Sequence, residues 1–374
     1  QSVAGLLQCF SAYTAALLQQ PTQSVQQLWA RQSVVKSTAE DQSSEQPERP
    51  YHSLTSRLSA YAAVMGDALA LVSGAQQLSY QQLVEQVAMR ARYLVEQGVK
   101  PGDIVGVWQP RDAELVVNLL AIQQAGGAYL PFDESTPVGR VAQIVRQAKV
   151  GFLLTDTRVE LDGVTLLALT GEGSDAVQLP VLLAEQAAYV LFTSGSTGEP
   201  KGVVISQGNL SHLCDGMAEL LSAYPLAGSR FAWRAPVVFD ASVQALALLG
   251  EGICLHVLTD EQRKDPQQML SYFAAEQIDW VDTTPSLSEV LLEQCAVGQA
   301  LPNQLIGGEA IRAELWRNLV AHNSRHNRVA YNLYGPTECT VNSSACLIAG
   351  ERPQLGAALS GVSLYVLDNA LQPV

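Results

Sequence analysis

Short apolar runs alternate with longer amphipathic stretches from about residue 80 to residue 332, and this alternation limits the fold more than any other feature. Ser79 can cap the first helical stretch, 80–97, and Gly98 follows it as a stop signal. Runs such as Ala187–Phe192 are apolar throughout, which is typical of strands buried in a parallel sheet. The sequence therefore predicts an α/β fold: layered α/β subdomains with largely parallel sheets flanked by helices. The expected strands are 103–108, 150–154, 164–169, 187–192, 252–258, 278–283, 304–306 and 328–332, and the expected helices are 80–97, 113–124, 209–222, 265–276, 286–295 and 311–321.

The two ends of the chain differ from this central part. Residues 1–30 suggest one or two short amphipathic helices, and residues 31–50 are polar and rich in Ser, Gln, Glu and Pro, as in a linker. We expect the main domain to occupy residues 51–374. The stretch 362–367 alternates before a turn-like Asp-Asn pair, so a small β subdomain is expected to start there, with a further strand at 370–374. A chain that stops inside such a hairpin is expected to be truncated.

Composition excludes several classes of protein. The 374 residues are 48 % hydrophobic and 16 % charged, which indicates a well-packed globule. A net charge of -14 argues against an extended nucleic-acid surface, although it allows local phosphate binding by backbone N–H groups. No apolar run approaches the roughly 18 residues of a membrane span. The six cysteines form no C-x-x-C pair, so we expect reduced thiols in a cytoplasmic protein without a structural metal site.

A glycine- and hydroxyl-rich segment between two apolar strands is the most informative stretch. Its glycines let the backbone approach an anion, its hydroxyl groups donate hydrogen bonds, and a lysine adds positive charge. It is not a Walker A loop, because Pro200 precedes the lysine and a strand follows. A surface hairpin of the same composition is the alternative. The candidate phosphate-binding residues are Thr193, Ser194, Gly195, Ser196, Thr197, Gly198 and Lys201.

The segment Tyr189–Gly202 resembles the signature of the adenylate-forming superfamily, which includes adenylation domains, acyl-CoA synthetases and luciferases. Further segments resemble the core motifs of nonribosomal peptide synthetase adenylation domains, in the expected order over roughly residues 55–374. Residues 1–30 faintly resemble the tail of a condensation domain. The matching segments are 78–83, 125–133, 239–242, 332–338 and 361–374.

This resemblance implies a site for ATP and Mg²⁺. Tyr334 would stack on adenine, Thr337 would donate to a phosphate oxygen, and Glu338 would hold Mg²⁺ as a hard oxygen ligand. Loops at the carboxyl ends of parallel strands are where α/β sheets bind ligands. The alternatives are a Pro-Gly turn with an exposed glutamate and a plain strand-to-helix turn at 307–310. Further nucleotide-binding residues implied by the resemblance are Gly308, Glu309, Asn332 and Gly335.

Asp240 ends an apolar run, where an acid is costly unless it is paired. The resemblance implies that it pairs with the α-ammonium group of an amino acid, an aspartate that acyl-CoA synthetases generally lack. A helix cap is the alternative. Alignment by motif assigns the pocket for the amino acid to Asp240, Ala241, Gln244, Asp282, Leu305, Gly307, Leu333, Val341 and Asn342.

The polar members of this pocket favour glutamine. Asp282 should accept from N–H groups, which keeps a diamino acid as the alternative, and free glutamate is disfavoured because no pocket cation offsets Asp282. The resemblance implies formation of an aminoacyl-adenylate, with Thr193, Lys201, Thr337 and Glu338 as the catalytic residues.

The resemblance also implies transfer of the activated residue to the phosphopantetheine of a downstream carrier domain, with a condensation domain upstream. The ribose-binding Asp and the mobile-lid Lys of the family would lie beyond residue 374, so the fragment alone is expected to be weak or inactive. Two other functions stay open: an acyl- or aryl-CoA ligase, and a degenerate module that only binds.

Overall fold

The computed structural model describes residues 50–194, 200–369 and 372. The chain divides into one unit over Pro50–Val362 and a second unit formed by residues 1–49 and 363–374. The expected condensation-domain tail, 1–30, and residues 31–49 of the expected linker lie outside the described residues. The larger unit covers Pro50–Val362, and the single domain expected over 51–374 stays a prediction.

Only the first half of the hairpin expected near the end of the chain lies among the described residues. Residues 362–366 are in no strand, and Leu367 makes only an isolated bridge. Asp368 N donates to the Gln372 carbonyl at 2.8 Å, and Gln372 N donates to Asp368 Oδ1 at 2.9 Å. The apolar side chains of 364–367 are exposed. Alternation specifies a strand only where one face is covered, and most of the expected partner, 370–374, lies outside the described residues.

The larger sheet of the unit Pro50–Val362 contains nine strands among the described residues, in the order β15-β14-β13-β12-β11-β9-β10-β1-β2. Its central run from β13 to β1 is parallel, and the outer strands β2, β14 and β15 are antiparallel to their neighbours. The strands are β1 (Leu69–Ser73), β2 (Gln76–Ser79), β9 (Arg230–Trp233), β10 (Cys254–Val257), β11 (Trp280–Thr283), β12 (Asn303–Ile306), β13 (Ala330–Tyr334), β14 (Ser344–Leu347) and β15 (Ala357–Ala358).

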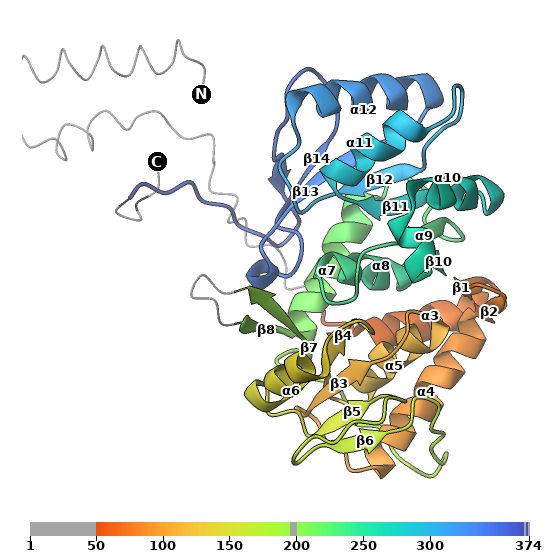
Figure 1. Ribbon diagram of the computed structural model, residues 1–374, viewed down its shortest axis with the longest axis vertical. Coiled ribbons are helices and arrows are strands. Elements are labelled where there is room, and N and C mark those ends of the chain that lie inside the picture. The colour runs from red at the N-terminus through yellow and green to blue at the C-terminus, as the bar shows by residue number, and fades with distance from the viewer. Residues whose placement is uncertain (1–49, 195–199, 370–371, 373–374) are drawn as a thin grey trace, which may run out of the picture. The chain divides into compact units, whose positions relative to one another are not determined.

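The smaller sheet contains six strands among the described residues, in the order β6-β5-β3-β4-β7-β8. Its strands are parallel except β8, which returns antiparallel to β7 at the edge (Figure 1). The strands are β3 (Ile104–Trp108), β4 (Ala128–Phe132), β5 (Phe152–Leu154), β6 (Thr165–Leu167), β7 (Ala187–Ser194) and β8 (Pro200–Ser206).

Helices connect and cover the strands. They are α3 (Leu54–Met65), α4 (Tyr80–Glu96), α5 (Ala113–Gln124), α6 (Val138–Gln147), α7 (Gln207–Leu220), α8 (Ala241–Leu249), α9 (Asp260–Lys264), α10 (Pro266–Ala275), α11 (Pro285–Gln294), α12 (Ala313–His326) and the short 3₁₀ helix η1 (Thr337–Cys339). No helix among the described residues is long and apolar enough to cross a membrane.

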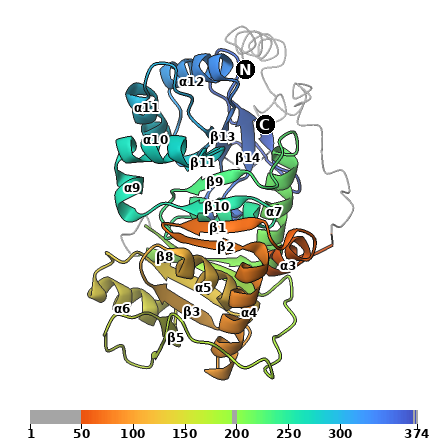
Figure 2. The same ribbon diagram turned by 90° about the vertical axis from the view of Figure 1, so that its right-hand side faces the viewer.

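The two sheets share one layer of helices. Helix α5 contacts β3 and β4 of the smaller sheet and β1 of the larger one, and α7 packs on α8 while it reaches β7 and β8. Figure 2 shows α9 to α12 along the other face of the larger sheet. A continuous apolar cluster includes Val105 of β3, Leu71 of β1 and Phe231 of β9, so burial of shared apolar area holds both sheets in one unit.

Local sequence explains where the predicted helices begin. The Ser79 hydroxyl accepts from Gln82 N at 3.3 Å, and the Gln82 side chain accepts from Ser79 N at 2.9 Å. This capping box confirms the predicted start of α4 and stabilises it by about 1 kcal/mol. Asp112 accepts from Leu115 N at 2.9 Å and begins α5 over the predicted range.

Candidate functional site

Four neighbouring parallel strands of the larger sheet place their carboxyl ends side by side. In the order β13, β12, β11 and β9, these strands are hydrogen-bonded neighbours. The loop 234–240 follows β9, residues 307–309 follow β12, and residues 335–338 follow β13. The sheet therefore gathers three of the predicted motifs at one edge, where α/β folds bind ligands.

The stem of the glycine-rich loop reaches this edge from the smaller sheet. Thr193 pairs with Lys201 across β7 and β8, and Thr193 Oγ1 donates to the Lys201 carbonyl at 3.5 Å. Strand β8 contacts η1, which carries Thr337 and Glu338. The Lys201 side chain is exposed. Ser194 ends β7, whereas the predicted Gly195, Ser196, Thr197 and Gly198 lie outside the described residues.

The turn after β13 is closely packed and strained. A Cβ at Gly335 would overlap the Val341 carbonyl oxygen, so only glycine fits there. Thr340 and Val341 have positive φ angles of 59° and 68°, and a β-branched residue in that region is a true outlier. Local strain of this kind persists where the surroundings over-determine it, often at functional sites. The exposed Tyr334 side chain flanks the turn, which suits it to stack on a flat ring.

Asp240 and Thr337 meet across the site. Thr337 Oγ1 donates to Asp240 Oδ2 at 2.7 Å. The Asp240 side chain makes no capping hydrogen bond to α8, which argues against the capping alternative. Burial raises the pKa of the Asp240 carboxyl, the bond from Thr337 opposes that shift, and the charge of nearby Glu338 adds to it. The site thus holds a half-buried carboxylate with no cation bonded to it among the described residues.

Gln244 and Asn342 form a buried amide pair in the predicted pocket. Asn342 Nδ2 donates to Gln244 Oε1 at 3.0 Å, and the same nitrogen lies 3.5 Å from Met217 Sδ. Gln244 Nε2 makes a long contact of 3.5 Å with the Ala241 carbonyl. The pair brings together α8 and the turn before β14, so two predicted pocket residues do lie together.

Asp282 is occupied by the protein itself. Its two carboxylate oxygens accept from Arg234 N at 2.8 Å and Ala235 N at 2.6 Å, and only 2 % of the residue is exposed. Burial raises its pKa, while those backbone bonds and the charges of Arg234 and Arg111 oppose the shift. The structure therefore makes Asp282 an anchor for the start of the loop that carries Asp240.

The remaining predicted residues divide between the opening and the wall of the site. Ala241 and Gly307 are half-buried, and Gly308 has a φ of +85° on the surface. Two residues are engaged elsewhere: Asn332 Nδ2 donates to the Gln354 carbonyl at 2.7 Å, and Glu309 Oε2 accepts from Ser286 N at 3.2 Å. The fully buried wall residues are Leu305, Leu333 and Val341.

Sequence reasoning missed Arg111. Its guanidinium lies 3.9 Å from the ring centroid of Trp233 and donates to the Trp233 and Leu258 carbonyls at 2.6 and 3.0 Å. From the loop after β3, Arg111 thus secures the end of β9, just before the backbone that Asp282 holds. No sequence signal could have found it, because the contact spans more than a hundred residues and depends on how the sheets pack.

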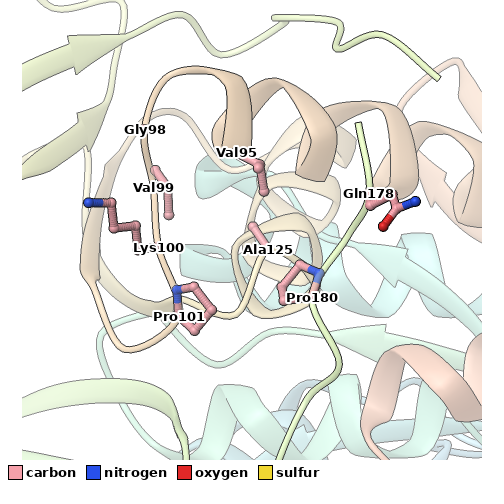
Figure 3. Close-up of a pocket in the computed structure, with 8 residues that line it drawn as sticks. All are labelled: Val95, Gly98, Val99, Lys100, Pro101, Ala125, Gln178 and Pro180. Carbon is pink, nitrogen blue, oxygen red and sulfur yellow. The ribbon is translucent and has the colours of Figure 1, made fainter. Parts of the chain in front are cut away.

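A separate cavity lies in the part of the unit built around the smaller sheet. Its volume is about 340 Å³, and Val95, Pro101, Ala125 and Pro180 are among its largely apolar lining residues (Figure 3). None of the candidate site residues lines it. We therefore assign the chemistry to the strand ends and not to this cavity.

The side chains at the strand ends can hold Mg²⁺ only together with the phosphates of a bound substrate. The described residues contain no group of three or more His, Cys, Asp or Glu side chains that could hold a metal. Glu338 is exposed on η1 and offers one carboxylate. Because Mg²⁺ keeps waters and takes one or two carboxylates together with substrate phosphates, a single glutamate beside a phosphate site fits this ion.

Comparison with known proteins shows the family to which this chain is similar. The model of a family described as AMP-binding enzyme matches residues 58–374. The dapdiamide synthesis protein DdaD of Enterobacter agglomerans is 36 % identical over 321 residues, which cover 84 % of this chain and 53 % of that protein. Bacitracin synthase 3 of Bacillus licheniformis is 34 % identical over 321 residues, which cover 82 % of this chain and 5 % of that protein.

Solved structures agree with these sequence matches. A four-domain nonribosomal peptide synthetase bound to AMP and glycine matches with a TM-score of 0.76 and 31 % identity. The match covers 86 % of this chain and 24 % of that one. The chain thus spans about half the length of DdaD and a smaller part of the synthetases.

Proposed function

The chain belongs to the AMP-binding enzyme family, as the core of a nonribosomal peptide synthetase adenylation domain, and on that premise we propose that it activates an amino acid with ATP. One observation carries the proposal: the half-buried Asp240 carboxylate is hydrogen-bonded to Thr337 at the strand ends, beside the stem of the glycine-rich loop. A protonated amine is the ligand that such a carboxylate recognises. A CoA ligase for simple carboxylic acids has no use for it.

The proposed reaction is attack of the substrate carboxylate on the α-phosphorus of ATP. One oxygen–phosphorus bond forms, the bond to the pyrophosphate leaving group breaks, and an aminoacyl-adenylate results. Positioning and charge stabilisation dominate this chemistry. Thr193 and Lys201 would face the phosphates, Tyr334 the adenine, and Asp240 the α-ammonium. Bound Mg²⁺, held by Glu338 and the phosphates, would neutralise the developing charge.

For the side chain of the amino acid we favour glutamine. A pair of side-chain amides can rearrange to donate to and accept from a substrate amide, and Gln244 and Asn342 form such a pair. The diamino-acid alternative relied on Asp282 as a free anion, and both oxygens of Asp282 accept backbone N–H groups. The described pocket residues include no cation to pair with glutamate.

The partners follow from the family. We propose that the activated amino acid passes to the phosphopantetheine thiol of a downstream carrier domain and that a condensation domain precedes the chain. Synthetase relatives in which this chain would be one part of a much longer protein support that arrangement.

The test is pyrophosphate exchange by the protein that carries this chain, measured across amino acids and across carboxylic acids without an amino group. The proposal predicts exchange with amino acids, strongest with glutamine. Exchange with the amine-free acids alone would favour the CoA ligase, and a protein that exchanges with neither while folded would be a binding module.

A further inference from the structure

The bond between Asp240 and Thr337 joins two residues that are proposed to serve different substrates. Thr337 is assigned to a nucleotide phosphate and Asp240 to the amino acid, yet Thr337 Oγ1 donates to Asp240 Oδ2 at 2.7 Å. A threonine hydroxyl has one hydrogen, so it donates to one acceptor at a time. A hydroxyl that donates to Asp240 cannot donate to a phosphate.

Asp240 needs a donor. Its carboxylate only accepts, burial raises its pKa, and the neighbouring charge of Glu338 adds to the cost of ionisation. The hydroxyl of Thr337 lowers that cost when no ammonium group is bound. The backbone N–H groups of Asp240 and Ala241 also donate to this carboxylate, so the departure of Thr337 removes one of its donors and an ammonium group can replace it.

The turn around Thr337 is too constrained to move as a whole. Gly335 is packed against the backbone of 341–343, and Ser343 N donates to the Tyr334 carbonyl at 2.7 Å. Thr340 and Val341 are already held at positive φ. The available change is therefore rotation of the Thr337 side chain, which can redirect one hydrogen without rebuilding the turn.

We propose that Thr337 couples the two substrates: its hydroxyl donates to Asp240 before the substrates bind, turns to a phosphate when nucleotide binds, and so releases Asp240 for the ammonium group. The inference rests on the proposed function. If Thr337 acts in this way, nucleotide and amino acid bind with positive coupling. Thermodynamic linkage then requires that each ligand raise the affinity of the other by the same factor.

The first test is calorimetry on this chain at about pH 8, where a carboxylate and an α-ammonium can both be charged. The ligands are the non-hydrolysable ATP analogue AMPPNP with Mg²⁺, and L-glutamine, L-glutamate and L-2,4-diaminobutyrate. For the amino acid that binds best, AMPPNP should lower the Kd about tenfold, the range of a hydrogen bond to a charged group. The same amino acid should lower the Kd of AMPPNP by the same factor. Independent binding of the two ligands to the wild-type chain would overturn the inference.

Variants of Thr337 distinguish coupling between the two ligands from a direct contact of Thr337 with only one of them. Thr337→Val keeps the shape and removes the hydrogen, so the amino acid alone should bind about tenfold more tightly than to wild type, and AMPPNP should no longer affect it. Thr337→Ser should retain the coupling. Cys339→Ser, an exposed position on the same 3₁₀ helix, is the matched control and should behave as wild type.

The opposite result has a clear meaning. If Thr337 stays on Asp240 while the ammonium takes the other oxygen, Thr337→Val will bind the amino acid equally or less tightly, and the inference is wrong while the proposed function stands. If AMPPNP binds but neither these amino acids nor the others used in the pyrophosphate exchange bind, with or without it, the proposed function itself fails. A melting temperature for each variant shows whether Thr337→Val folds. If it folds poorly, the wild-type measurement, in which each ligand should lower the Kd of the other by the same factor, still tests the inference.

Discussion

Asp240 carries its charge in surroundings that disfavour it. Burial raises the pKa of its carboxyl, and the residue that follows it opens α8. Asp240→Asn keeps the shape and removes the charge, so amino-acid affinity should fall by about a hundredfold, while AMPPNP affinity should not fall. Calorimetry with each ligand separately measures both. Equal affinity for the amino acid in Asp240→Asn and wild type would contradict the assignment.

Asp282 makes a different prediction, because its oxygens serve the backbone of residues 234 and 235. Asp282→Asn replaces one acceptor by an NH₂ group that faces a backbone donor, so the free energy of unfolding should fall by about 1–3 kcal/mol. The ratio of glutamine to glutamate affinity should stay within about twofold of wild type. Urea unfolding and calorimetry measure the two quantities. A large change of that ratio with unchanged stability would show that Asp282 contacts the substrate directly.

The amide pair of Gln244 and Asn342 should set the side-chain preference. Asn342→Leu removes a donor from the pocket, and glutamine affinity should fall at least tenfold relative to leucine affinity. Asn323→Leu is a matched control, since Asn323 is a buried amide on α12 with no hydrogen-bond partner for its side chain among the described residues. It should leave the preference unaltered. The prediction fails if both variants shift the preference alike.

At the scale of elements, the turn after β13 is the least tolerant part of the site. Gly335→Ala would force a methyl group into the Val341 carbonyl, so the turn must open and AMPPNP affinity should fall at least tenfold, with a lower melting temperature. Gly139→Ala, inside α6 with no atom near the added methyl group, should stabilise by about 0.5–1 kcal/mol instead. Thermal melting with and without AMPPNP compares the two. A Gly335→Ala protein that melts and binds like wild type would contradict this account of the turn.

Elements with strong local signals were predictable from the sequence. The capping serine of α4 and the capping aspartate of α5 mark helices whose predicted starts are confirmed. Helix α6, which starts after Pro137 without a side-chain cap, was not predicted. The β1–β2 hairpin was missed too, because β1 is specified by its pairing with β10 and β2 by its pairing with β1, and not by their own patterns.

The candidate site was predictable as a set of motifs but not as a set of contacts. The order of the motifs predicted that Thr337 and Asp240 belong to one site, and the structure adds a hydrogen bond between them. Asp282 and Asn332 had the right residue types for binding, yet their partners are backbone groups 47 and 22 residues away in the chain. Such pairings depend on strand register and on how the sheets pack, which residue patterns alone do not specify.

For the whole molecule, two buried histidines predict how stability depends on pH. Burial lowers the pKa of both His256 and His322 to about 4. Below pH 6.5 the unfolded chain takes up protons that the folded chain excludes, so stability falls between about pH 6.5 and pH 4, by up to about 3 kcal/mol for each histidine. Carboxyl groups with raised pKa, such as Asp240 and Asp282, oppose this loss when they take up protons in the folded state.

A variant isolates one histidine in this behaviour. His322 Nε2 accepts from Leu301 N at 3.1 Å, and a glutamine oxygen can replace that acceptor without titrating. His322→Gln should therefore lose less stability than wild type between pH 7 and pH 5. Urea unfolding at several pH values measures the slope. A slope equal to that of wild type would mean that His322 is not excluded from protonation.

Asp240 is proposed to receive the ammonium of an amino acid beside a bound nucleotide. A crystal structure of this chain with AMPPNP, Mg²⁺ and L-glutamine is the decisive experiment. We expect the α-ammonium within hydrogen-bond distance of the Asp240 carboxylate and the Thr337 hydroxyl turned to a phosphate oxygen. A nucleotide bound at the strand ends, with the amino acid elsewhere and the bond from Thr337 to Asp240 intact, would contradict it.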